Sequence, residues 1–185
     1  MTESNFQIHR LPAALSSRCT RAIFLDFDGV LHQPRAIAGA KPPLTPQEIQ
    51  AGWPQTFCHL GLLKNLLEGH SDIAVIVSSS WRLFLTDVEL GELLAPIEYW
   101  YGGSVGDRRL GRDAAIKESL VVNGITNYLV LDDVKTFFPG DWPQLLLCNS
   151  ALGLSDPLVY SELKRWINAA PLEESVEASL SCETF

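Results

Sequence analysis

The sequence has few cysteines, no long apolar run and no block of charge of one sign. Its four cysteines, Cys19, Cys58, Cys148 and Cys182, are far apart and form no CxxC pair. They indicate neither a disulfide framework nor a structural zinc site, and we expect reduced thiols. No stretch approaches the roughly 18 apolar residues that a membrane span requires, and the first residues lack the apolar core of a signal peptide. We therefore expect a cytoplasmic protein.

Acidic residues outnumber basic ones, 22 to 14, which gives a formal net charge of −8. Because this charge is spread along the chain, it disfavours non-specific attachment to nucleic acid, and a polyanionic substrate would need a local basic patch. With 185 residues, 46% of them apolar, the chain can build one well-packed domain. We expect an N-terminal extension over residues 1–20, the domain over 21–170 and a flexible acidic tail over 171–185.

Strands and helices alternate along the predicted domain. Short apolar runs predict strands at residues 22–27, 73–77, 128–131 and 145–148. Helical spacing and capping signals predict helices at residues 57–67, 87–94, 113–122 and 155–169. Residues 32–54 form a loop with a short helix beginning at Thr45-Pro46, and the aromatic segment 97–101 is ended by Gly102-Gly103. The alternation predicts an α/β fold with a doubly wound, mainly parallel, Rossmann-like sheet.

Two carboxylates follow the first predicted strand. Asp26 and Asp28 are two residues apart in DFDGVL, so their side chains point to the same side of the extended chain. Two buried like charges repel each other and are costly to desolvate, so such a pair usually requires a cation or a proton held for catalysis. Gly29 then lets the backbone turn sharply away. An isolated DxDG is also compatible with a purely structural turn.

Polar residues follow two further predicted strands. Asp132-Asp133 comes after residues 128–131, and Ser78-Ser79-Ser80 comes after residues 73–77. Because the carboxyl ends of the strands in a doubly wound sheet surround one crevice, we expect these side chains to meet there. Carboxylate and hydroxyl oxygens suit Mg²⁺ and phosphate better than zinc. The sequence therefore predicts a magnesium and phosphate site at this edge of the sheet.

The order and content of these motifs resemble the haloacid dehalogenase (HAD) superfamily of phosphotransferases. DFDGVL matches the first motif of that superfamily, while the strand-end serines, a cation opening the next helix and a strand ending in Asp-Asp match in type and order. VSSSWR also resembles a capless branch found beside RNA-repair domains, in which a hydroxyl residue precedes a tryptophan by two positions. The resemblance implies a HAD-like fold and a magnesium-dependent phosphomonoester hydrolase.

The resemblance also implies roles for the acidic residues. Asp26 would attack phosphorus and form an aspartyl-phosphate, and Asp28, with a raised pKa, would be the general acid and base. Magnesium would be held by Asp26, the carbonyl oxygen of Asp28 and Asp133, with Asp132 as a ligand or as support for one.

Two further roles have rival candidates. For the hydroxyl that contacts the phosphoryl group, the resemblance favours Ser79 over Ser78, and Ser80 suits the N-cap of the next helix. For the cation that neutralises phosphoryl charge, Arg112 is favoured over Lys117, because Arg112 opens the helix and the RNA-repair branch carries an arginine there.

Arg82 and His32 are weaker candidates. Arg82 follows Trp81 beside the proposed pocket and is suited to hold a substrate phosphate, but an arginine in the first turn of a helix is usually solvated. His32 follows DFDGVL and is suited to cover the pocket, but a lone loop histidine is usually at the surface.

The spacing of the motifs leaves little room for a cap domain between Asp26 and Ser79, or between Ser79 and Arg112. The resemblance therefore implies an open site, with residues 32–54 as a small lid and a nucleotide, a nucleic-acid end or another phosphate ester as the substrate. A signalling receiver is disfavoured. Its acidic pair would lie on the first strand and its phosphoacceptor on a later one, whereas here DFDGVL, which holds the proposed phosphoacceptor, follows the first strand. A non-catalytic HAD-like module that binds phosphate or a partner remains an alternative.

Overall fold

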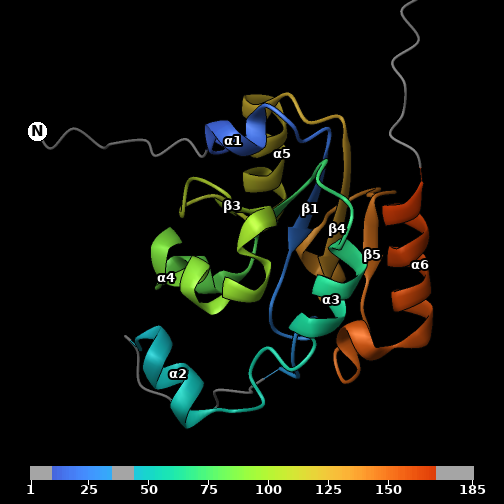
Figure 1. Ribbon diagram of the computed structural model, residues 1–185. Coiled ribbons are helices and arrows are strands. Elements are labelled where there is room, and N and C mark those ends of the chain that lie inside the picture. The colour runs from blue at the N-terminus through green and yellow to red at the C-terminus, as the bar shows by residue number, and fades with distance from the viewer. Residues whose placement is uncertain (1–9, 35–43, 170–185) are drawn as a thin grey trace, which may run out of the picture.

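The computed structural model describes residues 10–34 and 44–169, and it contains one five-stranded sheet with the strand order β3-β2-β1-β4-β5 (Figure 1). All neighbouring strands are parallel. The strands are β1 (Arg21–Leu25), β2 (Ile73–Val77), β3 (Tyr101–Ser104), β4 (Asn127–Asp132) and β5 (Leu145–Leu147). This is the predicted doubly wound, Rossmann-like α/β fold.

The chain builds the sheet outward from β1 in two directions. It passes from β1 through β2 to β3, then crosses back through α5 (Arg112–Asn123) to β4 and β5 on the other side of β1. The point where the strand order reverses therefore lies between β1 and β4. In open α/β sheets, ligands bind in the crevice beyond the carboxyl ends of the strands at this point.

Strand β1 lies at the centre of the sheet, between β2 and β4, and all five of its residues are buried. Alternate residues face opposite layers. Ile23 and Leu25 belong to one apolar cluster, and Ala22 and Phe24 belong to the other. Leu25 is in register with both Val77 of β2 and Leu131 of β4, so the three central strands end at the same level.

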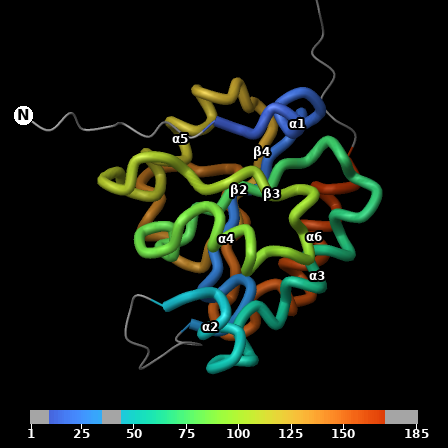
Figure 2. Tube along the Cα trace, turned by 60° about the vertical axis from the view of Figure 1, so that its left-hand side comes forward, coloured from blue at the N-terminus to red at the C-terminus, as the bar shows by residue number. Residues whose placement is uncertain are grey.

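Helices cover both faces of the sheet, as the two views show (Figures 1 and 2). The first cluster packs α3 (Leu60–Leu67), α4 (Asp87–Leu93) and α6 (Pro157–Asn168) against one face. The second packs α5 against the opposite face, together with Leu11 and the Phe138–Trp142 turn. Two short helices, α1 (Ala13–Ser16) and α2 (Pro46–Gly52), complete the described α-helices.

Capping residues mark the helix ends. Thr45 is the N-cap of α2 and Thr86 is the N-cap of α4, each in a capping box with a glutamate three residues later. Asp156 caps α6 by accepting a hydrogen bond from the Leu158 amide at 2.9 Å. Gly124 ends α5 in the left-handed conformation, as the Asn-Gly pair predicts.

Three predicted boundaries are corrected. Tyr101–Ser104 is an edge strand, although Gly102-Gly103 predicts a break there. A Cβ at Gly102 would lie 2.6 Å from Cδ2 of Leu11, at the tip of that flexible side chain. Strand β1 ends at Leu25, which places Asp26 just beyond it. Helix α3 begins at Leu60 and not at residue 57.

The expectations of no cap domain, no membrane span and reduced thiols can be compared with the described residues. Between β1 and α3, and between β2 and α5, the described residues form no cap domain. In the same described part, no helix is long and apolar enough to cross a membrane. Cys19, Cys58 and Cys148 are free thiols. The predicted tail, Cys182 within it, lies outside the described residues.

Candidate active site

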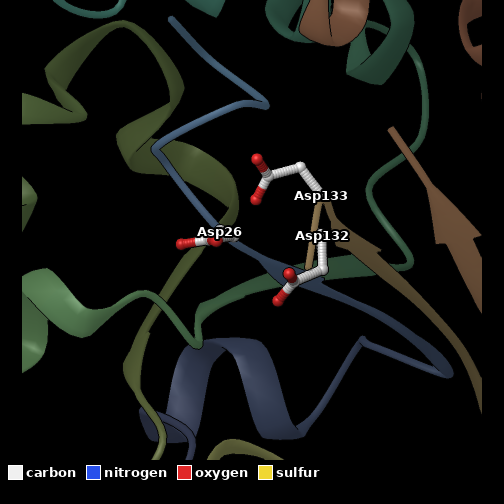
Figure 3. A group of neighbouring side chains, drawn as sticks. All are labelled: Asp26, Asp132 and Asp133. Atoms are coloured by element: carbon white, nitrogen blue, oxygen red, sulfur yellow. The ribbon is translucent and has the colours of Figure 1, made fainter. Parts of the chain in front are cut away.

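Three aspartates meet where β1 and β4 end. Asp26 follows β1, Asp132 is the last residue of β4, and Asp133 follows it. One carboxylate oxygen of each lies within 4.8 Å of the others, with the side chains converging from the two chain segments (Figure 3). The matched register of β1 and β4 produces this convergence, because it brings both strand ends to one level.

Arg112 links two of these carboxylates. Its Nη1 lies 2.5 Å from Asp26 Oδ2 and also contacts Asp132 Oδ2. The arginine side chain is only 8% exposed, and its guanidinium lies over the ring of Phe137, 4.6 Å from the ring centre. Arg112 reaches the site because it is the first residue of α5, whose N-terminus points to this edge of the sheet.

The rival cation, Lys117, lies elsewhere. It is one turn further along α5, is 60% exposed, and pairs with Asp113 at 3.6 Å. Its ammonium also lies 5.1 Å from the ring centre of Trp142. Of the two candidates, the structure brings Arg112 to the carboxylates and leaves Lys117 on the solvated side of α5.

The carboxylates carry more negative charge than Arg112 neutralises. Burial raises the pKa of Asp132 to about 6, and the charge of Asp26 adds to the shift, although Arg112 opposes it. Burial and Asp26 also raise the pKa of Asp133. Both shifts mean that the site resists full ionisation in the absence of a further cation. Three converging oxygen ligands with surplus negative charge fit Mg²⁺, so the donor set suits the metal that the sequence predicts.

Gly29 packs directly against one of these ligands. Its φ is +72°, and a Cβ built on it would overlap the carboxylate of Asp133. Only glycine tolerates both the left-handed backbone and this close approach. The glycine of DFDGVL therefore leaves room for Asp133, a relationship that the sequence alone does not disclose.

The carboxylate of Asp28 faces a different set of partners. Trp81 Nε1 donates a hydrogen bond to Asp28 Oδ2 at 2.8 Å, and His32 Nε2 lies 3.3 Å from Oδ1. Burial by itself raises the pKa of Asp28, but His32, Trp81 and Arg112 outweigh it, and the net pKa is lowered. The expectation of a raised pKa for Asp28 is therefore wrong for the ligand-free protein. Donors to the ionised form stabilise it more than burial disfavours it.

His32 and Arg82 are not at the surface, contrary to the sequence expectation. His32 is 1% exposed and Arg82 is 5% exposed. Arg82 lies under the loop before α5, where its Nη2 donates to the carbonyl oxygen of Leu110 at 3.4 Å. Burial and the charges of Arg112 and Arg108 lower its pKa. No local pattern distinguishes these residues from solvated ones, because segments distant in sequence bury them.

The three serines after β2 differ in their surroundings. Ser79 Oγ is the N-cap of the 3-10 turn η1 (Ser80–Leu83) and accepts from the Trp81 amide at 3.4 Å, so the N-cap is Ser79 and not Ser80. Since Ser79 only accepts in this contact, its hydroxyl hydrogen is still available to a phosphoryl oxygen. Ser78 Oγ is buried and has no partner among the described residues. Both serines therefore stay candidates, with Ser79 first.

Comparison with known proteins identifies the family. The family described as "HAD domain in Swiss Army Knife RNA repair proteins" matches residues 22–159. Searches of curated proteins and of solved structures found no match to this chain. The matched span contains the aspartate cluster, Arg112 and the serines after β2. The chain therefore belongs to the HAD superfamily, in the family of HAD domains of Swiss Army Knife RNA repair proteins.

Proposed function

We propose that this protein is a magnesium-dependent phosphomonoester hydrolase with Asp26 as its nucleophile. The observation that carries the proposal is the convergence of Asp26, Asp132 and Asp133 within 4.8 Å at the strand-order reversal, with Arg112 bridging two of them. Family membership supports hydrolase chemistry at this position. When bound by these aspartates, Mg²⁺ would neutralise charge on the transferring phosphoryl group.

In the first half-reaction, an oxygen of Asp26 forms a bond to phosphorus while the bond from phosphorus to the leaving oxygen breaks. Arg112 stays beside the nucleophile and stabilises the charge on the phosphoryl oxygens, with the hydroxyl of Ser79 or Ser78 as a further donor. Asp28 gives its proton to the leaving oxygen. The substrate alcohol then departs and the phosphoryl group remains on Asp26.

In the second half-reaction, a water oxygen attacks phosphorus and Asp28 takes its proton. The bond between Asp26 and phosphorus breaks, which releases inorganic phosphate and restores the free carboxylate. The lowered pKa of Asp28 keeps this carboxylate ionised, so it can accept the proton. For the acid role, a phosphomonoester monoanion can bring the proton, because the phosphoryl charge raises the pKa of a carboxylate beside it.

The substrate that we propose is a nucleotide, a nucleic-acid end or another phosphate ester. An open site without a cap in the described residues admits large substrates. The family description, which refers to RNA repair, favours a nucleic-acid end. Phe137, 44% exposed and in contact with Arg112, offers an apolar surface beside the nucleophile for the organic part of such a substrate.

The test is hydrolysis of para-nitrophenyl phosphate with and without Mg²⁺, by the native chain, by Asp26→Asn and by Asp113→Asn. Asp26→Asn keeps the shape of the nucleophile but removes its reactivity, and should abolish turnover. Asp113→Asn makes the same change on the far side of α5 and should leave turnover intact. Absence of Mg²⁺-dependent release in the native chain, with nucleotide and oligonucleotide phosphates also inert, would favour a non-catalytic phosphate-binding module.

A further inference from the structure

We propose that His32 and Trp81 are positioning residues that clamp the Asp28 carboxylate in the orientation needed to protonate the leaving oxygen. The inference rests on the proposed function, in which Asp28 is the general acid. Neither residue contacts the substrate or the reacting atoms in this proposal. Both act through Asp28, and the three residues together form the Asp28 clamp.

The two residues of the clamp face the two oxygens of Asp28. Trp81 Nε1 donates to Oδ2 at 2.8 Å from the turn after β2, and His32 Nε2 lies 3.3 Å from Oδ1 in the turn after β1. Contacts from two segments restrict rotation of the carboxylate. Each oxygen keeps a second lone pair for a proton or a substrate. The Asp28 side chain is 33% exposed and that of His32 is 0% exposed, so a substrate can reach the carboxylate but not the histidine.

The tautomer of His32 follows from its other nitrogen. Nδ1 accepts a hydrogen bond from the Phe57 amide at 3.3 Å, so a neutral ring carries its proton on Nε2. That nitrogen has no aligned partner among the described residues, and it faces Asp28 Oδ1. A buried N–H without a full hydrogen bond is unfavourable, and contacts of this kind tighten when a substrate binds. The geometry therefore directs the His32 proton to Asp28.

An aromatic cluster fixes the rings of the clamp. The His32 ring centre lies 5.2 Å from that of Phe57 and 5.6 Å from that of Trp81, and Phe27 packs edge-on against both aromatic partners at 5.0 and 5.6 Å. Phe27 lies between Asp26 and Asp28 in the sequence. The cluster thus joins the clamp to the backbone that carries both aspartates, and a rotation of either ring is sterically blocked.

Phe57 holds a strained conformation in this cluster. Its φ is +60°, and it is the one non-glycine residue with positive φ in the described chain. Such a conformation is unfavourable for a bulky side chain and persists only where the surrounding contacts require it. In this conformation the Phe57 amide donates to His32 Nδ1 and the Phe57 ring packs against the His32 ring. Both contacts fix the orientation of His32.

The clamp makes a prediction that a merely structural role does not. A para-nitrophenolate leaving group is stable as an anion and needs little protonation, whereas an alkoxide leaving group needs the proton of Asp28. Misplacing Asp28 should therefore slow hydrolysis of an alkyl phosphate, such as glycerol phosphate, far more than hydrolysis of para-nitrophenyl phosphate. Loss of folded protein would lower both rates by the same factor.

The variants are His32→Phe and Trp81→Phe, which keep an aromatic ring and remove the N–H, and His32→Gln, whose amide can still donate. We expect the first two to lower kcat for glycerol phosphate by about 10-fold or more, which is part of the roughly 10²–10⁴-fold that general acid catalysis contributes, with KM little changed. Their kcat for para-nitrophenyl phosphate should fall by less than about 3-fold, and His32→Gln should recover part of the loss.

Two matched controls make the same substitutions at residues that do not contact Asp28. Trp100→Phe removes an indole hydrogen bond of the same length, 2.8 Å, made to the carbonyl oxygen of His70. His70→Gln makes the histidine change away from the site. Neither should alter the ratio of the two kcat values. Equal losses on both substrates in the clamp variants, or no loss, would overturn the clamp, whereas an inactive native chain would overturn the proposed function itself.

Discussion

The guanidinium of Arg112 contacts the carboxylate of Asp26 at 2.5 Å, although 86 residues separate them along the chain. Both side chains are almost fully buried, and the same nitrogen also contacts Asp132. The cation is thus placed beside the proposed nucleophile before any substrate arrives. Its position is set by the start of α5, so it needs no rearrangement to meet a phosphoryl group.

Replacing Arg112 should impair both activity and stability. Arg112→Met leaves two buried carboxylates without their cation, so the free energy of unfolding of the metal-free protein should fall by about 3 kcal/mol. Turnover should fall by about 100-fold or more, because stabilisation of the phosphoryl charge is lost. Urea denaturation and initial rates measure the two effects. Lys117→Met is the control, and equal effects at the two positions would refute the role of Arg112.

Metal binding should depend on pH through Asp132. Its pKa of about 6 lies above that of an unfolded aspartate, so the folded state binds more protons and the metal-free protein loses stability as pH rises from about 4 to about 6. Mg²⁺ requires the ionised carboxylate. The increase in Tm caused by Mg²⁺ should therefore grow over this interval and level off above about pH 7. Thermal denaturation with and without Mg²⁺ between about pH 4 and about pH 8 tests this prediction.

The control for that experiment is Asp132→Asn, which cannot titrate. In this variant the Mg²⁺-induced increase in Tm should be smaller and should depend less on pH in this interval, the remaining dependence coming from Asp133, whose pKa is also raised. An increase in the native protein that is the same at every pH would contradict the assignment of Asp132 to the metal site.

Gly29→Ala should damage the site beyond its effect on the backbone. The left-handed φ alone makes alanine unfavourable by roughly 1–2 kcal/mol. The new methyl group would also displace Asp133, so Mg²⁺ affinity should fall by about 10-fold or more, as measured by calorimetric titration. Gly124→Ala provides the matched control, because Gly124 also has positive φ but open space around it. Its Mg²⁺ affinity should equal that of the native chain.

Arg21 should support the fold and not the chemistry. Arg21 is 3% exposed, pairs with Asp72 at 2.7 Å, and donates from Nη1 to three carbonyl oxygens at the end of α6. Arg21→Met should lower the free energy of unfolding by about 3 kcal/mol, whereas Arg165→Met, at an exposed ion pair, should change it by less than about 1 kcal/mol. Chemical denaturation measures both. The folded fraction should keep its kcat, and a selective loss of kcat would contradict this assignment.

Most of the sheet and the position of the site could be predicted from the amino-acid pattern. Unbroken apolar runs are the signature of strands buried on both faces, and they located β1, β2, β4 and β5 to within a few residues. Parallel order then placed Asp26 and the Asp132-Asp133 pair at one edge, because the carboxyl ends of such strands converge. These inferences succeeded because they depend on local pattern and on a rule that holds for the whole fold class.

Which side chains meet at that edge depends on the packing of segments that are distant in the sequence. Arg112 contacts the carboxylates, whereas Lys117 does not. His32 and Arg82 are buried. Gly102-Gly103 is part of an edge strand and not a break. The pKa of Asp28 is also lowered against the effect of burial, first by His32 and then by a tryptophan 53 residues away. Burial and hydrogen bonding between distant segments depend on how helices and loops pack over the strand ends, and no local pattern in the chain encodes that packing.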